Sequence, residues 1–235
     1  MLKYFREIRN KLVKEGNLKK YLAYAIGEIM IVVVGILLAL YLDNQNQERS
    51  NKRLENQYYQ SMKDQLNKDL DIIIDEMYYN QTYLDQLSFA EKIISLNDRT
   101  NLDTLGKIVL NMVKYSDFRR KSNIYQTLVT SGEIIIINNK SITEKLQNLE
   151  ETYTYINRLE ENHATIILSH IIPDIRERIQ FNPVKVENPD ALFNYQFQNS
   201  FDILIYIMME KSDIYNLAKE EIISAIELID LELGD

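Results

Sequence analysis

The feature that most constrains this chain is an apolar run of 22 residues, from Tyr21 to Leu42, in which Glu28 is the only charged residue. An α-helix of that length spans about 33 Å, which is enough to cross the hydrocarbon core of a bilayer. A cleaved signal peptide has a shorter apolar core and ends in a small-x-small site, which "LLALYLDNQ" does not offer. We therefore predict one uncleaved transmembrane helix over residues 21–42.

The charges on the two sides of this run predict its orientation. Residues 1–20 carry seven Lys or Arg and two Glu, whereas residues 43–53 carry three basic and two acidic residues. Because the more basic flank stays in the cytoplasm, we expect the N-terminus in the cytoplasm and residues 43–235 on the opposite side of the membrane. Residues 43–235 hold 20 basic and 32 acidic side chains, a net charge of −12, so we expect no nucleic-acid partner.

The cytoplasmic segment, residues 1–20, has an amphipathic pattern in which Leu2, Phe5, Ile8 and Leu12 recur at helical spacing. One interpretation is a helix that lies on the anionic inner leaflet or docks a cytoplasmic partner, and the other is ordinary topogenic charge. The basic residues expected at the membrane surface are Lys3, Arg6, Arg9, Lys11, Lys14, Lys19 and Lys20.

The domain over residues 43–235 is predicted to be helical. The chain has no cysteine, so this domain must be held together by packing alone. Apolar periodicity predicts five helices, which cover residues 43–96, 102–115, 124–131, 141–172 and 201–231. We therefore predict an all-α fold class, with one N-terminal transmembrane helix followed by an extracytoplasmic antiparallel helical bundle with long helices.

Local signals predict several boundaries of these helices. Gly132 is expected in the left-handed conformation that ends a helix, and the residues 133–137 that follow are either extended or an irregular turn. Ser141 and Glu144 match a capping box at the next helix start. Residues 178–190 are expected to form a loop, closed by Asn188 as N-cap and by Pro189 at the first helical position.

Glu28 shares a helix face with Lys20 and Tyr24, beside a stripe of small residues at four-residue spacing. This small-xxx-small pattern lets transmembrane helices pack closely, and an isolated carboxylate facing lipid costs about 2.5 to 3.5 kcal/mol or more. We expect Glu28 to accept a hydrogen bond or ion pair where this helix meets a copy of itself or another membrane protein. The alternatives are a carboxylate that snorkels or is protonated, and a proton or ion relay. The predicted transmembrane interface comprises Ala23, Tyr24, Gly27, Glu28, Gly35 and Ala39.

The sequence offers little catalytic chemistry, and we predict no catalytic residue, no cofactor and no metal. The two histidines, His163 and His170, are seven residues apart and would share one face of an α-helix, near Glu160 and Asp174. This spacing is not that of usual helical metal sites, which pair residues three or four apart. A zinc enzyme on this face is therefore only the third hypothesis.

Two stretches resemble a family of small Bacteroidetes membrane proteins of unknown function. The first is "GEIMIVVVGILLALYLDNQNQER", although Gln45 stands where that family usually has Trp. The second is "YQTLVTSGEI", residues 125–134. The resemblance implies the same single-pass topology in a bacterial inner membrane, with the N-terminus in the cytoplasm and residues 43–235 in the periplasm, and it carries no reaction. The matching positions of the first stretch are Gly27, Glu28, Ile29, Gly35, Ile36, Leu37, Ala39, Leu40, Asn44 and Asn46.

From these patterns we expect a membrane-anchored, non-enzymatic binding, scaffolding or accessory subunit of an inner-membrane assembly. Its expected partners are the lipid bilayer and either a second copy of the chain or another membrane protein. The alternative is an extracytoplasmic ligand sensor that signals through its transmembrane helix. Because the cytoplasmic segment is only about 20 residues long, such a sensor would need a separate cytoplasmic partner.

Overall fold

The computed structural model describes residues 18–120 and 123–234, and the chain divides into two units, residues 1–55 and 56–235. The amphipathic pattern of residues 1–17, with Lys3, Arg6, Arg9, Lys11 and Lys14, lies outside the described residues. The described part of the first unit is helical throughout and belongs to α2, Leu18–Ser95. Its apolar side chains are exposed one after another, for example Leu22 at 57% and Ile31 at 68%.

Among the described residues, α2 is the one helix long and apolar enough to cross a membrane. The apolar part near its N-terminal end has none of its side chains buried inside the protein. Exposed runs of this size are unusual for a soluble protein and typical of a surface that lipid covers.

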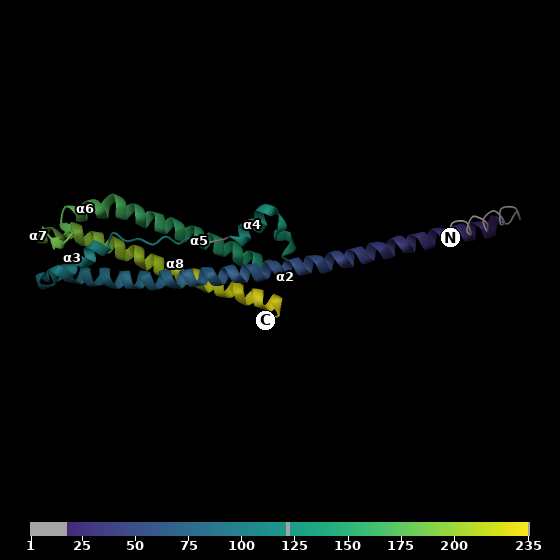
Figure 1. The fold of residues 1–235 in the computed structure, drawn as a ribbon, viewed down its shortest axis with the longest axis horizontal. Coiled ribbons are helices and arrows are strands. Elements are labelled where there is room, and N and C mark those ends of the chain that lie inside the picture. The colour runs from purple at the N-terminus through teal and green to yellow at the C-terminus, as the bar shows by residue number, and fades with distance from the viewer. Residues whose placement is uncertain (1–17, 121–122, 235) are drawn as a thin grey trace. The chain divides into compact units, whose positions relative to one another are not determined.

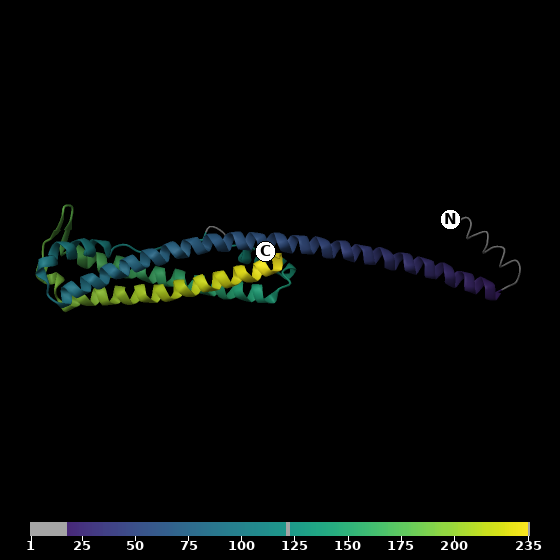
Figure 2. The same ribbon diagram turned by 90° about the horizontal axis from the view of Figure 1, so that it is seen from below.

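The second unit is an all-helical bundle, as predicted, in which the C-terminal half of α2 lies beside two other long helices (Figures 1 and 2). Contacts of α8 with Lys63 and Glu91 of α2 show that these two helices run antiparallel, and α8 runs antiparallel to α5 as well. The helices after α2 are α3, Leu102–Asn111, α4, Ile124–Ser131, α5, Lys140–Ile166, α6, Ile172–Arg176, α7, Pro189–Leu192, and α8, Tyr195–Leu233.

Several predicted boundaries are confirmed. Gly132 has a φ of 77° and ends α4, and Asn188 caps α7 by accepting a hydrogen bond from the Ala191 amide. The isoleucine-rich stretch after Gly132 is neither extended nor irregular but a 3-10 helix, η2, Glu133–Ile136. A second 3-10 turn, η1, Arg99–Asn101, follows α2.

The capping box predicted at Ser141 and Glu144 is wrong, because the N-cap of α5 lies two residues before Ser141. The side chain of Asn139 is the N-cap and accepts hydrogen bonds from the amides of Ser141 and Ile142. An Asn side chain can cap a helix alone, without a reciprocal Glu. The last helix also begins earlier than predicted, at Tyr195, since Asn194 caps it through the Phe197 amide.

The helix predicted over residues 141–172 is interrupted before Pro173. A π-helical turn, η3, Ile167–Ile171, follows α5, and Pro173 lies in the first turn of α6. The wider turn suits a residue that has no amide to donate and whose ring would clash with the preceding turn. The segment predicted as a loop contains a short antiparallel hairpin, β1, Ile179–Phe181, paired with β2, Val184–Val186.

The core of the bundle follows a strict alternation of three- and four-residue steps. This spacing is that of a left-handed supercoiled bundle, in which core positions repeat every 3.5 residues. On α8 every position of the series is buried: Phe201, Leu204, Met208, Lys211, Tyr215, Ala218, Ile222, Ala225 and Ile229. On α5 the buried series is Ile142, Leu146, Leu149, Tyr153, Ile156, Glu160, His163 and Ile167.

Candidate functional site

The predicted transmembrane interface lies uncovered on α2 in a single chain. Ala23, Gly27, Gly35 and Ala39 are exposed, and Glu28 is half-buried. A methyl group placed on either glycine would meet no atom within 4 Å. The role of these residues stays a prediction, as does that of Tyr24, Lys19 and Lys20, which are also in α2.

The bundle contains a second, unpredicted group of polar residues at core positions. We call it the polar layer, and it comprises Glu76 and Asn80 from α2, Glu160 and His163 from α5, and Lys211 from α8. It lies where the apolar core divides into two clusters, one containing Leu204 and Met208 and the other Tyr215 and Ile222. Lys211 stands between these two pairs on α8, so the polar layer separates the two apolar clusters.

Glu160 is the acceptor at the centre of this arrangement. Its carboxylate accepts hydrogen bonds from Ser116 Oγ at 2.9 Å, from the Phe118 amide at 2.5 Å and from Tyr215 Oη at 2.5 Å. Two of these donors, Ser116 and Phe118, belong to the segment between α3 and α4, whose described residues 114–120 form no helix or strand. A buried carboxylate is tolerated when such donors satisfy it, and burial and Glu160 together raise the pKa of Tyr215.

Lys211 is 1% exposed, although lysine is almost never buried without a partner. Its Nζ donates to Ser116 Oγ at 2.7 Å and lies 3.3 Å from His163 Nδ1. Burial lowers the pKa of Lys211 to about 8, against the opposing attraction of Glu160 and Glu76. Burial also raises the pKa of the Glu76 carboxyl, and the charge of Glu160 adds to that shift.

His163 is as buried as Lys211, and burial lowers its pKa to about 3, with the nearby Lys211 charge adding to the shift. The imidazole is therefore neutral at pH 7, and Nδ1 accepts the Lys211 hydrogen bond while Nε2 carries the proton. The ring also packs edge-on against Tyr83, with centroids 6.4 Å apart.

The prediction that His163 and His170 share a face is wrong, because His163 is buried and His170 is exposed. His170 lies within the π-helical turn η3, whose wider turn rotates it away from the face of His163. Asp174 is also engaged elsewhere, in an ion pair with Arg178. Within residues 18–120 and 123–234, no group of three or more His, Cys, Asp or Glu side chains could hold a metal ion.

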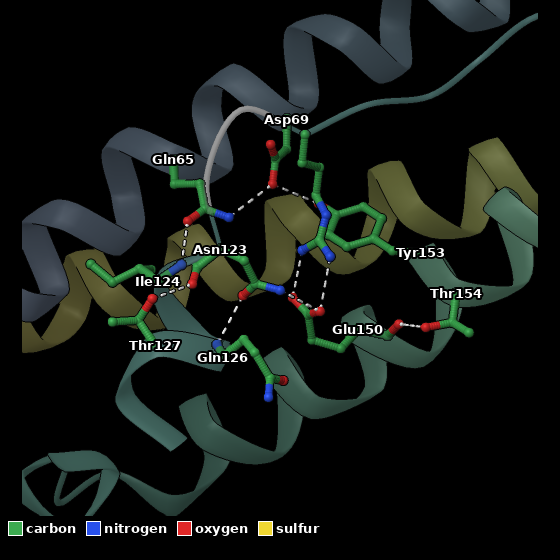
Figure 3. A network of polar contacts seen from close by, with 10 residues as sticks. Gln65, Asp69, Asn123, Ile124, Gln126, Thr127, Glu150, Tyr153 and Thr154 are labelled. Carbon is green, nitrogen blue, oxygen red and sulfur yellow. Dashed lines mark hydrogen bonds and ion pairs between the residues drawn. The ribbon is translucent and has the colours of Figure 1, made fainter. Parts of the chain in front are cut away.

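A second polar network lies nearer the other end of the same segment (Figure 3). Arg120 forms two hydrogen bonds to Glu150, at 2.5 and 2.9 Å, and stacks 4.3 Å from the centre of the Tyr153 ring. Asn123 donates to the same carboxylate, and Gln65 accepts from the Ile124 amide. The first network thus joins the segment to α5 and α8, and the second joins its other end to α5 and α2.

Asp69 completes this second network. Its carboxylate accepts from Gln65 Nε2 at 3.3 Å and from Tyr153 Oη at 3.2 Å. Burial raises the pKa of Asp69, although these hydrogen bonds and the charge of Arg120 oppose that shift. The low exposure of Gln65, Asp69 and Tyr153 places this group, like the polar layer, inside the bundle.

A cavity of about 830 Å³ lies between the segment and α5. Ser116, Arg119 and Arg120 line it on one side, and Asn157 and Glu160 on the other. A second cavity of about 570 Å³ is lined by residues of α2, including Glu76 and Tyr79, and again by Ser116. Ser116 therefore joins the buried polar layer to both cavities.

Sequence reasoning named Glu160 and His163 as metal candidates and missed Lys211, Ser116 and Tyr215. The signal for Lys211 was present, because it occupies a position of the three-four series that is otherwise apolar on α8. Ser116 gave no such signal, since it lies in a segment without periodicity.

Comparison with known proteins gives one match. Residues 28–167 match the model of a family described as "Family of unknown function (DUF6090)". No curated protein and no solved structure matches the chain. Because the match covers more than half of the 235 residues, the chain belongs to this family of unknown function, DUF6090.

Proposed function

We propose that the chain is a single-pass protein of the bacterial inner membrane that acts as a non-enzymatic binding, scaffolding or accessory subunit. The observation that carries the proposal is the uncovered apolar part of α2, where large apolar side chains such as Leu22, Ile31 and Leu42 are exposed. A surface of this length requires lipid or another protein to cover it. The resemblance of residues 27–49 to Bacteroidetes membrane proteins supports a bacterial membrane.

In this proposal residues 1–20 lie in the cytoplasm, residues 21–42 span the membrane and residues 43–235 form the periplasmic domain. The charge difference across the span supports this orientation, since residues 1–20 carry seven basic side chains. The acidic domain on the other side is suited to bind proteins or small molecules rather than nucleic acid.

The spanning helix would associate with a second copy or with another membrane protein. Gly27 and Gly35 support this step, because open space beside them lets a second backbone approach closely. Glu28 lies next to Gly27 on the helix, and a carboxylate at this depth is expected to find a donor in the partner helix.

The test is native mass spectrometry of the full-length protein, extracted gently from its own membrane. We expect the wild type to appear as a defined oligomer or with a co-purifying protein, and Glu28→Gln and Gly35→Leu to lose that partner. Val33→Leu is the matched control, because it adds a methylene group away from the small-residue stripe. Bare monomers of the wild type, or full retention of the partner by both variants, would refute the association.

The cavity beside Glu160 favours the alternative function, an extracytoplasmic ligand sensor. Its volume of about 830 Å³ is that of a small-molecule site, and α2 contains both the proposed span and one wall of the bundle. Such a sensor would carry an extra small mass in native spectra. Asn157→Trp places a large ring in the cavity from α5 and should remove that mass. Asn148→Trp is the control, because Asn148 is not among the residues that line the cavity, and it should keep the mass.

A further inference from the structure

Ser116 has the surroundings of a nucleophile. Its side chain is half-buried and lines both cavities. Its Oγ lies 2.7 Å from Lys211 Nζ, 2.9 Å from a Glu160 oxygen and 3.3 Å from Tyr215 Oη. A hydroxyl within hydrogen-bond reach of an amine, with that amine held by further groups, is the general arrangement of an activated serine.

Lys211 is suited to act as the base. The groups around its amine are Glu76 from α2, Ser116 from the connecting segment, Glu160 and His163 from α5, and Tyr215 one turn along α8. The two carboxylates raise its pKa and burial lowers it, and burial dominates, so the pKa is about 8. A substantial fraction of this amine is therefore neutral near pH 8, unlike an ordinary lysine.

We propose that Ser116 is a nucleophile that becomes acylated by an ester-type acyl donor, with Lys211 as its general base. The Ser116 hydroxyl, which donates to Glu160 in the structure, turns its proton toward the neutral Lys211 amine, and Oγ adds to the carbonyl carbon as Lys211 Nζ takes that proton. The ester carbon–oxygen bond then breaks, and the proton passes to the departing alcohol. This goes beyond the proposed function, because neither scaffolding nor reversible ligand binding requires a nucleophile, and it includes no turnover.

Glu160 is a positioning residue in this arrangement. It accepts hydrogen bonds from the Ser116 hydroxyl and the Phe118 amide, which fixes the position of Ser116, a residue that lines both cavities. Charge selects the class of acyl donor. Glu160 and Glu161 line the larger cavity and Glu76 the smaller, while the Arg119 and Arg120 side chains are already paired with Asp117 and Glu150. Acyl donors that bear an ammonium group are therefore favoured.

The experiment treats full-length protein in detergent with an alkyl fluorophosphonate, which loses fluoride when a serine oxygen attacks phosphorus. Intact-mass and peptide mass spectrometry should show one adduct, on Ser116. Its rate should rise about 50-fold from pH 6 to pH 8, as the neutral fraction of an amine of pKa near 8 does. A p-nitrophenyl ester with a trimethylammonium group should also acylate faster than p-nitrophenyl acetate.

The variants separate the roles of the two residues. Ser116→Ala should give no adduct, and Lys211→Met should slow the reaction by about 100-fold or more, whereas Ser88→Ala, at an exposed serine of α2, should react like the wild type. No adduct on the wild type, an adduct on another residue, or an unchanged rate in folded Lys211→Met would overturn the proposal. If a variant fails to fold by tyrosine fluorescence, the mapped site and pH profile of the wild type decide.

Discussion

Acid should destabilise the bundle through His163. The pKa of His163 is lowered from 6.5 to about 3 in the folded protein, chiefly by burial. Between these two pH values the unfolded chain therefore binds a proton at His163 and the folded chain does not. The contribution of His163 to stability is therefore complete above pH 6.5 and is lost as the pH falls toward 3. Between pH 7 and pH 5 the two pKa values give a loss of about 2 kcal/mol.

The assay is urea unfolding of the full chain at pH 7 and pH 5, followed by tyrosine fluorescence, because the chain has 16 Tyr and no Trp. His163→Gln keeps a side-chain oxygen that accepts from Lys211 and has no proton to bind. Burial raises the carboxyl pKa of Asp69 and Glu76, which acts in the opposite direction on acidification. The quantity to compare is therefore the pH 7 to pH 5 difference in wild type against His163→Gln.

We expect the wild type to lose about 2 kcal/mol more than His163→Gln on acidification. His170→Gln is the matched control, since this histidine is exposed within the π-helical turn, and this variant should lose as much stability as the wild type. An equal loss in wild type and His163→Gln would show that His163 is not buried in a neutral form, and would refute the reasoning.

Three further predictions concern local structure and are measured by the same urea unfolding at pH 7. Asn139→Ala should lower the free energy of unfolding by about 1 kcal/mol because it removes the N-cap of α5, whereas Ser141→Ala should lower it by only a few tenths of a kcal/mol. A larger loss in Ser141→Ala than in Asn139→Ala would identify Ser141 as the N-cap instead. Glu150→Leu should cost about 3 kcal/mol because it leaves Arg120 without its carboxylate, and a loss below 1 kcal/mol would contradict a buried pair. Gly106→Ala should stabilise a Val186→Ala background by about 1 kcal/mol through helix propensity. It should do so less in the wild type, where the new methyl would lie 3.0 Å from Val186 Cγ2, and equal effects in both backgrounds would exclude that contact.

The long helices could be predicted from the sequence because their apolar residues repeat at fixed intervals. The wrongly predicted helix ends were those set by a single side chain. At Asn139, for example, one side-chain oxygen caps α5 and so decides which residue begins the helix. The π-helical turn before Pro173 could not be predicted, since it changes the faces of His163 and His170 without any change in hydrophobic pattern. The three-residue strands β1 and β2 were too short to show alternation.

The candidate site could be predicted only in part, for a different reason. Glu160, His163 and Lys211 each stand in a three-four series of buried positions, so their burial follows from periodicity. Ser116, which forms hydrogen bonds with Glu160 and Lys211, lies far from both in sequence, in a segment that periodicity cannot place. Which polar residues meet was therefore decided by the path of that segment across the bundle.

That path also explains why the polar layer is retained in a core that apolar residues would fill more stably. Tyr115 to Arg120 form no hydrogen bond to another backbone group within residues 18–120 and 123–234, so side-chain contacts hold this part of the segment. Glu160 supplies acceptors for Ser116 and Phe118, and Lys211 supplies the cation that a buried carboxylate needs nearby. An apolar replacement of Glu160 and Lys211 together would improve packing between α5 and α8 and release Ser116 from the cavity wall. Glu160 and Lys211 stabilise the bundle less than well-packed apolar residues would. We therefore infer that their role is to fix the position of this segment rather than to stabilise the bundle.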